Sequence, residues 1–151
     1  MPIQINLITS GKPAFMPLLL LADEEEKYID EYLYRGDLFA LCDDGLKAVC
    51  VVTDEGNGVF ELQNIAVDVP YQQRGYGRAL VKHVFAHYTG RGRTMLVGTG
   101  DSPPHVAFYE SCGFVYSHRI KDYILERYEQ PIYENGVQLR DKIYLTKELE
   151  Y

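Results

Sequence analysis

Residues 62–80, with the sequence LQNIAVDVPYQQRGYGRAL, constrain the fold more than any other part of this chain. They read as an apolar strand, a short polar turn and the start of an amphipathic helix. Two glycines, Gly75 and Gly77, lie where the turn meets the helix. Glycine lets a bulky group approach the backbone, and the first N–H groups of a helix have no partner within that helix. We therefore expect this turn to bind an anion, and a phosphate group suits it best.

Arg74 and Arg78 flank the turn, and their guanidinium groups would add charge-assisted contacts to a phosphate. Two common phosphate-binding patterns are excluded. A P-loop requires Gly-x-x-x-x-Gly-Lys-Ser/Thr, but here the glycines are two residues apart and no Lys-Ser/Thr pair follows. The dinucleotide fingerprint requires a third Gly or Ala where the helix packs on its strand, and Leu80 occupies that position. The pattern that remains is Gln-x-x-Gly-x-Gly at residues 72–77.

The composition indicates one ordinary domain, since 46% of the 151 residues are apolar. The formal net charge of −7 argues against a non-specific nucleic-acid binder. It favours cationic partners only weakly, because solubility explains it equally well.

The three cysteines, Cys42, Cys50 and Cys112, are scattered singly, which is typical of a reducing compartment. The longest apolar run, residues 15–22, is far shorter than the roughly 20 residues of a membrane span, and no export signal is visible. We expect a cytoplasmic protein without a membrane partner.

The hydrophobic pattern predicts a mixed α/β domain with the element order β-α-α-β-β-β-α-β-α-β-β. One helix begins after Gly75 and ends at Gly90, with an apolar stripe along one side. Residues 118–140 form a polar, tyrosine-rich excursion before the last strand. The other expected helices are 13–21, 24–34 and 103–112, and the expected strands are 2–9, 38–42, 46–53, 59–67, 94–98, 114–117 and 142–146.

The chain resembles the GNAT superfamily of acyl-CoA-dependent N-acyltransferases. The resemblance rests on the Gln-x-x-Gly-x-Gly turn, on the strand end at residues 64–67, and on residues 108–114, FYESCGF, which are similar to the Tyr-x-x-x-Gly-Phe element of the family. The turn alone is a weak signal, and its combination with the second element is a strong one. Element order and length also match, so the resemblance covers nearly the whole chain. It implies a GNAT-like single domain over residues 1–151, with a central mixed, splayed β-sheet flanked by about four helices.

The resemblance implies acetyl-CoA as co-substrate. The backbone of Ile65, Ala66 and Val67 would pair with the pantetheine arm, as an added strand pairs with a sheet edge. The thioester would lie between two parallel strands, 59–67 and 94–98, that diverge. The family often has an Asn after the second of these strands, and Asp101 or Ser102 would replace it here. The pyrophosphate would lie on the turn formed by Gln72, Gln73, Arg74, Gly75, Tyr76, Gly77 and Arg78.

Tyr109 is the candidate general acid. The leaving thiolate of CoA departs more easily when it receives a proton, and a phenol with a pKa of about 10 keeps its proton at neutral pH. The resemblance implies that the tyrosine of the Tyr-x-x-x-Gly-Phe element lies beside the CoA sulfur. The alternative is a tyrosine that only packs beside Phe108 and Phe114.

Glu61 is the candidate general base, because an alkyl ammonium must lose a proton before its nitrogen can attack. We expect Glu61 to share a strand face with Gln63, Ile65 and Val67. A carboxylate among apolar neighbours gains basicity through desolvation. The resemblance implies a carboxylate near this place, acting directly or through a water molecule. A solvent-facing strand residue is the equally weighted alternative.

The acceptor is open. In a GNAT-like fold its pocket would be built from the first two helices and the late loop, where tyrosines and acids would hold a cationic amine or simply form a polar surface. A small amine such as a polyamine, an aminated sugar, and a peptide or protein amine all remain. Arg127 and Arg140 would also permit a carboxylated acceptor. The candidate lining residues are Asp23, Asp122, Tyr123, Arg127, Tyr128, Arg140 and Asp141.

No metal is expected, because His83 and His87 lie four residues apart without acidic or cysteine partners.

Two other functions compete with an N-acetyltransferase. One is a non-catalytic CoA-binding sensor module, and the other is a nucleotide-binding module, because an anion site alone does not distinguish ADP from CoA. The resemblance also leaves a homodimer open.

Overall fold

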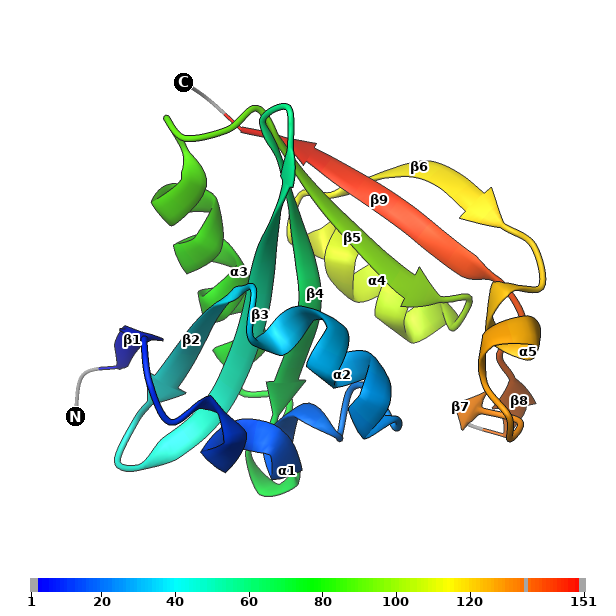
Figure 1. Cartoon of the computed structure of the whole chain (residues 1–151), viewed down its shortest axis with the longest axis horizontal. Coiled ribbons are helices and arrows are strands. Elements are labelled where there is room, and N and C mark those ends of the chain that lie inside the picture. The colour runs from blue at the N-terminus through cyan, green and yellow to red at the C-terminus, as the bar shows by residue number, and fades with distance from the viewer. Residues whose placement is uncertain (1–2, 135, 150–151) are drawn as a thin grey trace.

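The computed structural model describes residues 3–134 and 136–149. In these residues seven strands form one mixed sheet in the order β1-β2-β3-β4-β5-β9-β6 (Figure 1). All neighbouring strands in this sheet are antiparallel except β4 and β5. The strands are β1 (Gln4–Ile8), β2 (Asp37–Cys42), β3 (Leu46–Gly56), β4 (Val59–Val67), β5 (Thr94–Gly100), β6 (Val115–Ile120) and β9 (Lys142–Glu148).

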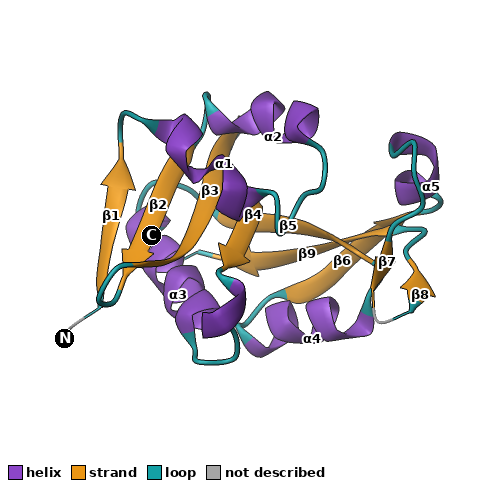
Figure 2. Cartoon of the chain, turned by 90° about the horizontal axis from the view of Figure 1, so that it is seen from below, coloured by secondary structure: helices purple, strands orange, loops and turns teal. Residues whose placement is uncertain are grey.

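Helices cover both faces of the sheet, with α1 and α2 on one face and α3 and α4 on the other (Figure 2). The fifth helix, α5, is short. It lies with the small hairpin β7–β8 near the start of β9. Among the described residues, no helix combines the length and the apolar character that a membrane crossing requires. The helices are α1 (Met16–Leu19), α2 (Glu26–Leu33), α3 (Tyr76–Tyr88), α4 (Pro103–Ser111) and α5 (Tyr123–Arg127), and the hairpin strands are β7 (Tyr133–Glu134) and β8 (Val137–Gln138).

The core consists of two apolar layers that share the central strands. Successive side chains of a strand point to opposite faces of the sheet. In β3, Ala48, Cys50 and Val52 pack into the layer beneath α3. Val49 and Val51 pack into the layer beneath α1 and α2. Because both faces are covered, β3 is a continuous apolar run rather than an alternating one.

The parallel strands β4 and β5 pair over only part of their length. The ladder runs from the pair Val59–Thr94 to the pair Leu62–Val97. Both strands continue beyond this point, yet they no longer pair with each other. This confirms the splayed sheet that the resemblance implies. The carboxyl ends of the two strands therefore border a gap, at the edge where α/β sheets commonly bind ligands.

A β-bulge in β4 lies at the start of this divergence. The two consecutive β3 residues Val51 and Val52 pair with Asn64 and Leu62, which leaves Gln63 as an extra residue in β4. A bulge of this kind bends its strand and locally increases the twist. The divergence of β4 from β5 thus coincides with an inserted residue in β4.

The bulge changes which side chains share a face of β4. Glu61 lies opposite Thr53 on the face that carries α1 and α2. Beyond the bulge, Ile65 and Val67 pack against the layer beneath α3. The expectation that Glu61 shares its face with Ile65 and Val67 is therefore wrong. One inserted residue reverses the alternation, and an alternating pattern in the sequence does not reveal it.

Most expected elements match the observed ones, and the strand expected at residues 59–67 has the observed bounds. The helix expected at residues 13–21 is instead a 3-10 turn over Lys12–Phe15 followed by the four-residue α1. The strand expected at residues 2–9 begins at residue 2, which lies outside the described residues. The main difference lies in residues 118–140, which contain the end of β6, the helix α5 and the hairpin β7–β8. Helix α5 comes in addition to the four helices expected around the sheet. It lies beside the gap between β4 and β5 rather than on a face of the sheet (Figure 1).

Candidate active site

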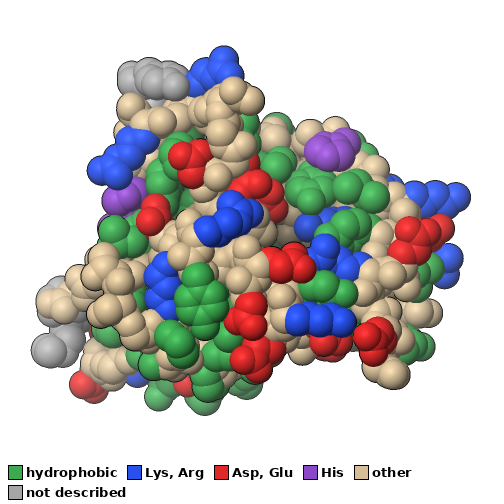
Figure 3. Space-filling view, in the orientation of Figure 1, with side chains coloured by type: hydrophobic (Ala, Val, Ile, Leu, Met, Phe, Trp, Pro, Cys, Tyr) green, Lys and Arg blue, Asp and Glu red, His purple; other side chains and the backbone are tan. Residues whose placement is uncertain are grey.

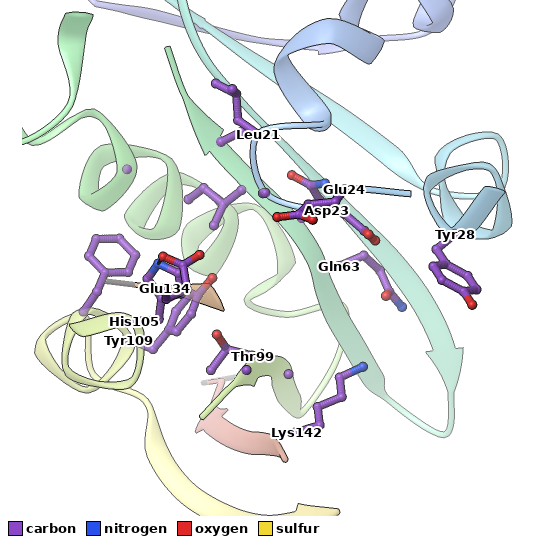
Figure 4. Close-up of a pocket in the computed structure, with 18 of the residues that line it drawn as sticks. Leu21, Asp23, Glu24, Tyr28, Gln63, Thr99, His105, Tyr109, Glu134 and Lys142 are labelled. Carbon is purple, nitrogen blue, oxygen red and sulfur yellow. Dashed lines mark ion pairs between the residues drawn. The ribbon is translucent and has the colours of Figure 1, made fainter. Parts of the chain in front are cut away.

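A cleft of about 990 Å³ occupies the gap between the ends of β4 and β5. Its lining residues come from the loop before α2, from α2 itself, from β4, from the turn before α3, and from β5, α4, α5 and β9. Segments far apart in the sequence therefore meet in one cavity. Figure 4 labels side chains around its interior from the loop before α2 and from α2, β4, β5, α4, β7 and β9.

The turn before α3 presents unpaired backbone N–H groups. Gln73 and Gly75 both have positive φ angles, of 64° and 88°, and Gly75 is the N-cap of α3 without a side-chain hydrogen bond. Within the described residues, no backbone or side-chain acceptor binds the N–H groups of residues 73–78. This cradle of amides at a helix N-terminus is the geometry that binds a phosphate.

The two glycines of the turn have different roles. Gly75 adopts a left-handed conformation, and a Cβ atom there would meet open space. Gly77 is buried, and a Cβ atom there would lie 3.2 Å from the ring of Phe108 in α4. The first glycine thus allows the bend and a close ligand approach, and the second allows α3 to pack against α4.

The side chains of the turn are largely engaged within the protein. The guanidinium group of Arg78 donates to the carbonyl oxygen and to Oγ of Ser111, at 2.9 Å each. The guanidinium group of Arg74 lies 5.5 Å from the ring centroid of Tyr71, and Arg74 does not line the cleft. Gln72 Nε2 donates to the carbonyl oxygen of Val67 at 3.1 Å. Backbone amides rather than arginines therefore dominate this end of the cleft, and direct arginine–phosphate contacts stay a prediction.

The end of β4 offers a free strand edge to the cleft. Ile65, Ala66 and Val67 line the cleft, and on the β5 side their backbone has no strand partner. Such an edge accepts an extended polar chain by forming ladder hydrogen bonds. Across the cleft, Asp101 and Ser102 are not among the lining residues. The carboxylate of Asp101 accepts the backbone N–H of Arg140 at 2.9 Å, and Ser102 is buried at the start of α4.

Thr99 lies in the cleft where the sequence analysis expected Asp101 or Ser102 to act. Figure 4 shows its side chain on the same side of the cleft as Tyr109. The roles expected for Asp101 and Ser102 stay predictions, and the side chain that β5 itself presents to the cleft is that of Thr99.

Tyr109 both packs and faces the cleft. Its ring makes edge-to-face contacts with Phe108 and Phe114, with centroid distances of 5.2 Å and 5.8 Å. The residue also lines the cleft, and none of the described residues hydrogen-bonds to its hydroxyl. Burial raises the pKa of this phenol above its ordinary value. Tyr109 therefore keeps its proton near neutral pH, and its ring is fixed by its aromatic neighbours.

Glu61 is a buried carboxyl group in the wall of the cleft, with 9% of the residue exposed. Burial raises its pKa, and the positive charge of Lys142 partly offsets this effect. A carboxylate whose pKa is raised binds a proton more strongly than an ordinary one. The structure therefore places a strengthened base beside the gap between β4 and β5, although on the face opposite to Ile65.

Asp23 lies at the α2 end of the cleft in a network of hydroxyl groups. Its carboxylate accepts the hydroxyl protons of Tyr128 at 3.1 Å and Tyr32 at 3.4 Å, and the backbone N–H of Glu25 at 3.4 Å. Asn64 Nδ2 donates to the hydroxyl oxygen of Tyr32 at 2.9 Å. Burial raises the pKa of Asp23, and these donors counteract the rise.

Contacts between α2 and α5 close this end of the cleft. The hydroxyl of Tyr28 donates to the carbonyl oxygen of Arg127 at 2.5 Å, and the Arg127 guanidinium lies 3.9 Å from the Tyr28 ring centroid. Arg127 also forms an ion pair with Glu31 at 2.8 Å. Together with the Asp23–Tyr128 hydrogen bond, these contacts join segments about a hundred residues apart. We call this set of contacts the α2–α5 clasp.

The expected acceptor residues fall into two groups. Asp23, Tyr123, Arg127 and Tyr128 line the cleft. The other expected residues do not line the cleft; they are Asp122, Arg140 and Asp141. Asp122 forms an ion pair with Arg140 at 3.6 Å, and Asp141 Oδ1 accepts the backbone N–H of Asp122 at 2.9 Å. The second group holds the loop before α5 in place.

Several lining residues were not found from the sequence. They include Lys142 and Tyr144 of β9, and the pair His105–Glu134, whose Nε2 and Oε2 atoms are 4.0 Å apart. Burial raises the pKa of Tyr144 to about 12. In the sequence β9 reads only as a strand, and nothing in its pattern shows that its start borders the gap. Within the described residues, no group of three or more His, Cys, Asp or Glu side chains is arranged to hold a metal ion.

The splayed sheet, the amide cradle and the tyrosine beside the gap together define a class of acyl-CoA-dependent transferases. Residues 35–116 match the acetyltransferase (GNAT) domain, and the chain belongs to this family. The resemblance inferred from the sequence is thereby confirmed.

Individual relatives extend the similarity over nearly the whole chain. It is 37% identical over 150 residues to an uncharacterized N-acetyltransferase, YvbK, of Bacillus subtilis (strain 168), covering 97% of each protein. A GNAT family acetyltransferase from Elizabethkingia anophelis with acetyl-CoA bound is 33% identical and superposes with a TM-score of 0.92, over 97% of this chain and 98% of that one. A Bacillus subtilis acetyltransferase in complex with CoA is also 33% identical, with a TM-score of 0.91 over 98% and 99% of the two chains. The chain is an acetyl-CoA-dependent N-acetyltransferase.

Proposed function

We propose that this enzyme transfers the acetyl group directly from acetyl-CoA to a primary amine while both substrates are bound. The observation that carries the proposal is the gap between β4 and β5. It brings the amide cradle, the Tyr109 hydroxyl and the Glu61 carboxylate, which are remote in the sequence, into one cleft.

The cofactor binds along the edge of β4 in this proposal. The N–H groups of residues 73–78 hold the pyrophosphate, because they face no protein acceptor in the described structure. The free edge of Ile65, Ala66 and Val67 holds the pantetheine arm. The thioester then reaches the gap beside Tyr109.

The reaction needs a balanced set of proton and electron movements. Glu61 takes a proton from the ammonium group of the acceptor, directly or through a water molecule. The nitrogen lone pair then attacks the thioester carbonyl carbon, and a backbone N–H of Ile65 or Val67 stabilises the developing oxyanion. The carbon–sulfur bond breaks as Tyr109 gives its proton to the sulfur. The tyrosinate regains a proton from the attacking nitrogen, which yields the neutral amide and CoA, and Glu61 releases its proton to solvent. Base, acid and oxyanion donor are thus all supplied by the protein, so the proposed reaction has no step for a metal.

Direct attack is favoured over an acetyl-enzyme intermediate because none of the three cysteines lines the cleft. Burial also raises the pKa values of Cys50 and Cys112. A thiol with a raised pKa carries little thiolate and is a poor nucleophile.

The acceptor in this proposal is a small-molecule or peptide amine. Figure 3 shows acidic and basic side chains intermingled on the displayed face, without the continuous basic patch that nucleic acid would require. The three free cysteines fit a reducing cytoplasm, and we propose that the chain works there as a single domain. The residues of the edge strand β6 are all solvent-exposed, and this strand is the surface on which a second copy would pair in a homodimer.

Release of CoA from acetyl-CoA in the presence of a broad amine panel tests the proposal. Tyr109→Phe is expected to lower kcat by about 10²-fold or more, the usual contribution of a general acid, while acetyl-CoA still binds in calorimetry. Tyr34→Phe removes an exposed hydroxyl outside the cleft and serves as the matched control. Binding of acetyl-CoA without turnover on any amine would instead establish a CoA-binding sensor module.

A further inference from the structure

Lys142 is a cation in the cleft that the protein itself leaves without an anionic partner. Its ammonium nitrogen lies 4.7 Å from the ring centroid of Tyr123 and 4.9 Å from that of Tyr144. In the described part of the chain, no carboxylate lies within ion-pair distance of this nitrogen, and it donates no hydrogen bond to the protein. The two rings hold the ammonium group in position by cation–π contacts without neutralising it.

The other cations that line the cleft are already engaged. Arg35 pairs with Glu55 at 2.9 Å, and Arg127 pairs with Glu31 at 2.8 Å. The Arg78 guanidinium is bound to Ser111. The two arginines that the sequence analysis offered for a carboxylated acceptor, Arg127 and Arg140, are therefore both occupied, and Lys142 is the cation available to a bound ligand.

Lys142 and the candidate base face the same part of the cleft. The Lys142 side chain packs over Gly98 of β5, and Gly98 lies two residues beyond Leu96, the β5 partner of Glu61. In agreement with this, the positive charge of Lys142 lowers the pKa of Glu61, against the larger effect of burial. The two residues come from different strands, since Lys142 begins β9 and Glu61 belongs to β4. In Figure 4 the Lys142 side chain points into the cleft, toward the side that carries Gln63. An acceptor whose nitrogen reaches Glu61 would therefore place its neighbouring atoms beside Lys142.

We propose that Lys142 binds a carboxylate of the acceptor, and that the acceptor is a free amino acid with its amine and carboxylate a few bonds apart. This inference rests on the proposed amine acetylation. A carboxylate completes the charge-assisted contacts of the Lys142 ammonium. It must lie in the same part of the cleft as the reacting nitrogen, because Lys142 and Glu61 both line the cleft and Lys142 packs over Gly98, two residues beyond the β5 partner of Glu61.

The same charge argues against the competing acceptors. A polyamine would bring further ammonium groups toward Lys142, and like charges in a cleft of reduced dielectric repel. The α-carboxylate of a peptide's first residue is consumed in a peptide bond, so a peptide N-terminus offers Lys142 no adjacent anion.

The contacts at the α2 end of the cleft favour a small acceptor. The α2–α5 clasp ties Asp23 to Tyr128 and Tyr28 to Arg127 across the cleft. Because these contacts bridge the two sides of the cleft, they favour a small acceptor over an extended polypeptide.

The test compares free amino acids with their carboxamides and their decarboxylated amines, and adds putrescine and spermidine as acceptors. We expect the free acids to be acetylated with the highest kcat/KM. Lys142→Met keeps the length of the side chain and removes its charge, and it should raise KM for the free acid at least tenfold. The same variant should leave KM for acetyl-CoA and for the carboxamides within about twofold of the original.

Lys147→Met is the matched control, because Lys147 is in the same strand β9 but does not line the cleft. Unchanged melting temperature and acetyl-CoA binding of Lys142→Met would show that the fold and the cofactor site are intact. Equal losses with acids and carboxamides, or a preference for carboxamides or polyamines over acids, would overturn the role of Lys142 while leaving amine acetylation in place. An absence of turnover with every amine would overturn both proposals.

Discussion

At the scale of single residues, burial decides the chemistry of the cleft. Glu61 and Tyr109 both have pKa values raised by desolvation, with opposite consequences for their proposed roles. The raised pKa makes the carboxylate a better base, and it keeps the phenol protonated as an acid. Desolvation thus strengthens the carboxylate as a proton acceptor and keeps the phenol protonated, while it also makes the phenol a weaker proton donor.

Glu61→Gln tests the role of the base. It should lower kcat/KM by about 10²- to 10⁴-fold, because an amide does not accept the ammonium proton. In the original enzyme, activity should fall as the pH decreases through the raised pKa of Glu61, and the variant should lack this limb of the pH profile. Rate measurements from pH 4.5 to 9 check this, with Glu26→Gln as an exposed control outside the cleft. If Glu61→Gln keeps the same acidic limb of the pH profile, that limb reflects the titration of another group.

The stability of the same variant has a defined sign. A carboxyl group with a raised pKa in the folded state binds protons more tightly when folded, so its contribution to the free energy of unfolding is greatest at low pH. That contribution is lost as the pH rises from the unfolded-state pKa through the folded-state pKa. Glu61→Gln should therefore raise the melting temperature at pH 8 relative to the original protein, and by less at pH 4. Calorimetry at the two pH values measures the difference, and a lower melting temperature at pH 8 would contradict it.

At the scale of elements, local backbone features create the site. The positive φ angles of Gln73 and Gly75 aim the amides of the turn outward, and the bulge at Gln63 coincides with the divergence of β4 from β5. The left-handed conformation of Gln73, a residue with a side chain, costs conformational stability, as strained residues at functional sites commonly do.

Gly75→Ala tests the turn. A Cβ atom at φ = 88° costs about 1 kcal/mol of stability, and at this position it would also project into open space beside the amides. We expect a lower melting temperature and an at least tenfold weaker affinity for acetyl-CoA in calorimetry. Gly90→Ala is the matched control, because Gly90 has a φ of 86° and equally open surroundings at the other end of α3. It should lose similar stability with no change in affinity, and equal affinity losses in both variants would argue against the cradle.

At the scale of the whole molecule, one sheet carries two apolar layers. The central strands contribute side chains to both layers, so neither layer persists without the sheet between them. We predict a single cooperative unfolding transition, as expected for one domain of 151 residues. Differential scanning calorimetry with equal calorimetric and van't Hoff enthalpies would agree with this prediction, and two separate transitions would divide the chain into two units.

Acetyl-CoA should stabilise the whole molecule by mass action. At a concentration a hundred times its dissociation constant, a ligand that binds only the folded state adds about 2.7 kcal/mol, which corresponds to a rise in melting temperature of about 5–10 °C. Thermal-shift measurements check this, with ATP and NAD as controls for general phosphate binding. An equal shift with ATP would favour the nucleotide-binding alternative.

The sequence predicts most elements because their signals are local. Glycines stop helices, alternating or continuous apolar runs mark strands, and the strand at residues 59–67 has its predicted bounds. The turn at residues 72–77 and the position of Tyr109 also follow from short motifs. Residues 118–140 were predicted less well, because α5 and the β7–β8 hairpin are short and depend on contacts with α2 and β9.

The sequence by itself determined that a glycine-rich turn meets a helix, that a tyrosine follows at a fixed distance, and that the chain forms a mixed sheet with acetyl-CoA chemistry. Only the tertiary structure decided that β4 carries a bulge, that Glu61 faces α1 and α2, and that Lys142 lines the same cleft as Glu61 while both candidate arginines are paired. The reason is physical. Backbone conformation at a turn depends on neighbouring residues, whereas the face of a side chain beyond a bulge and the partner of a charge depend on segments that meet only after folding.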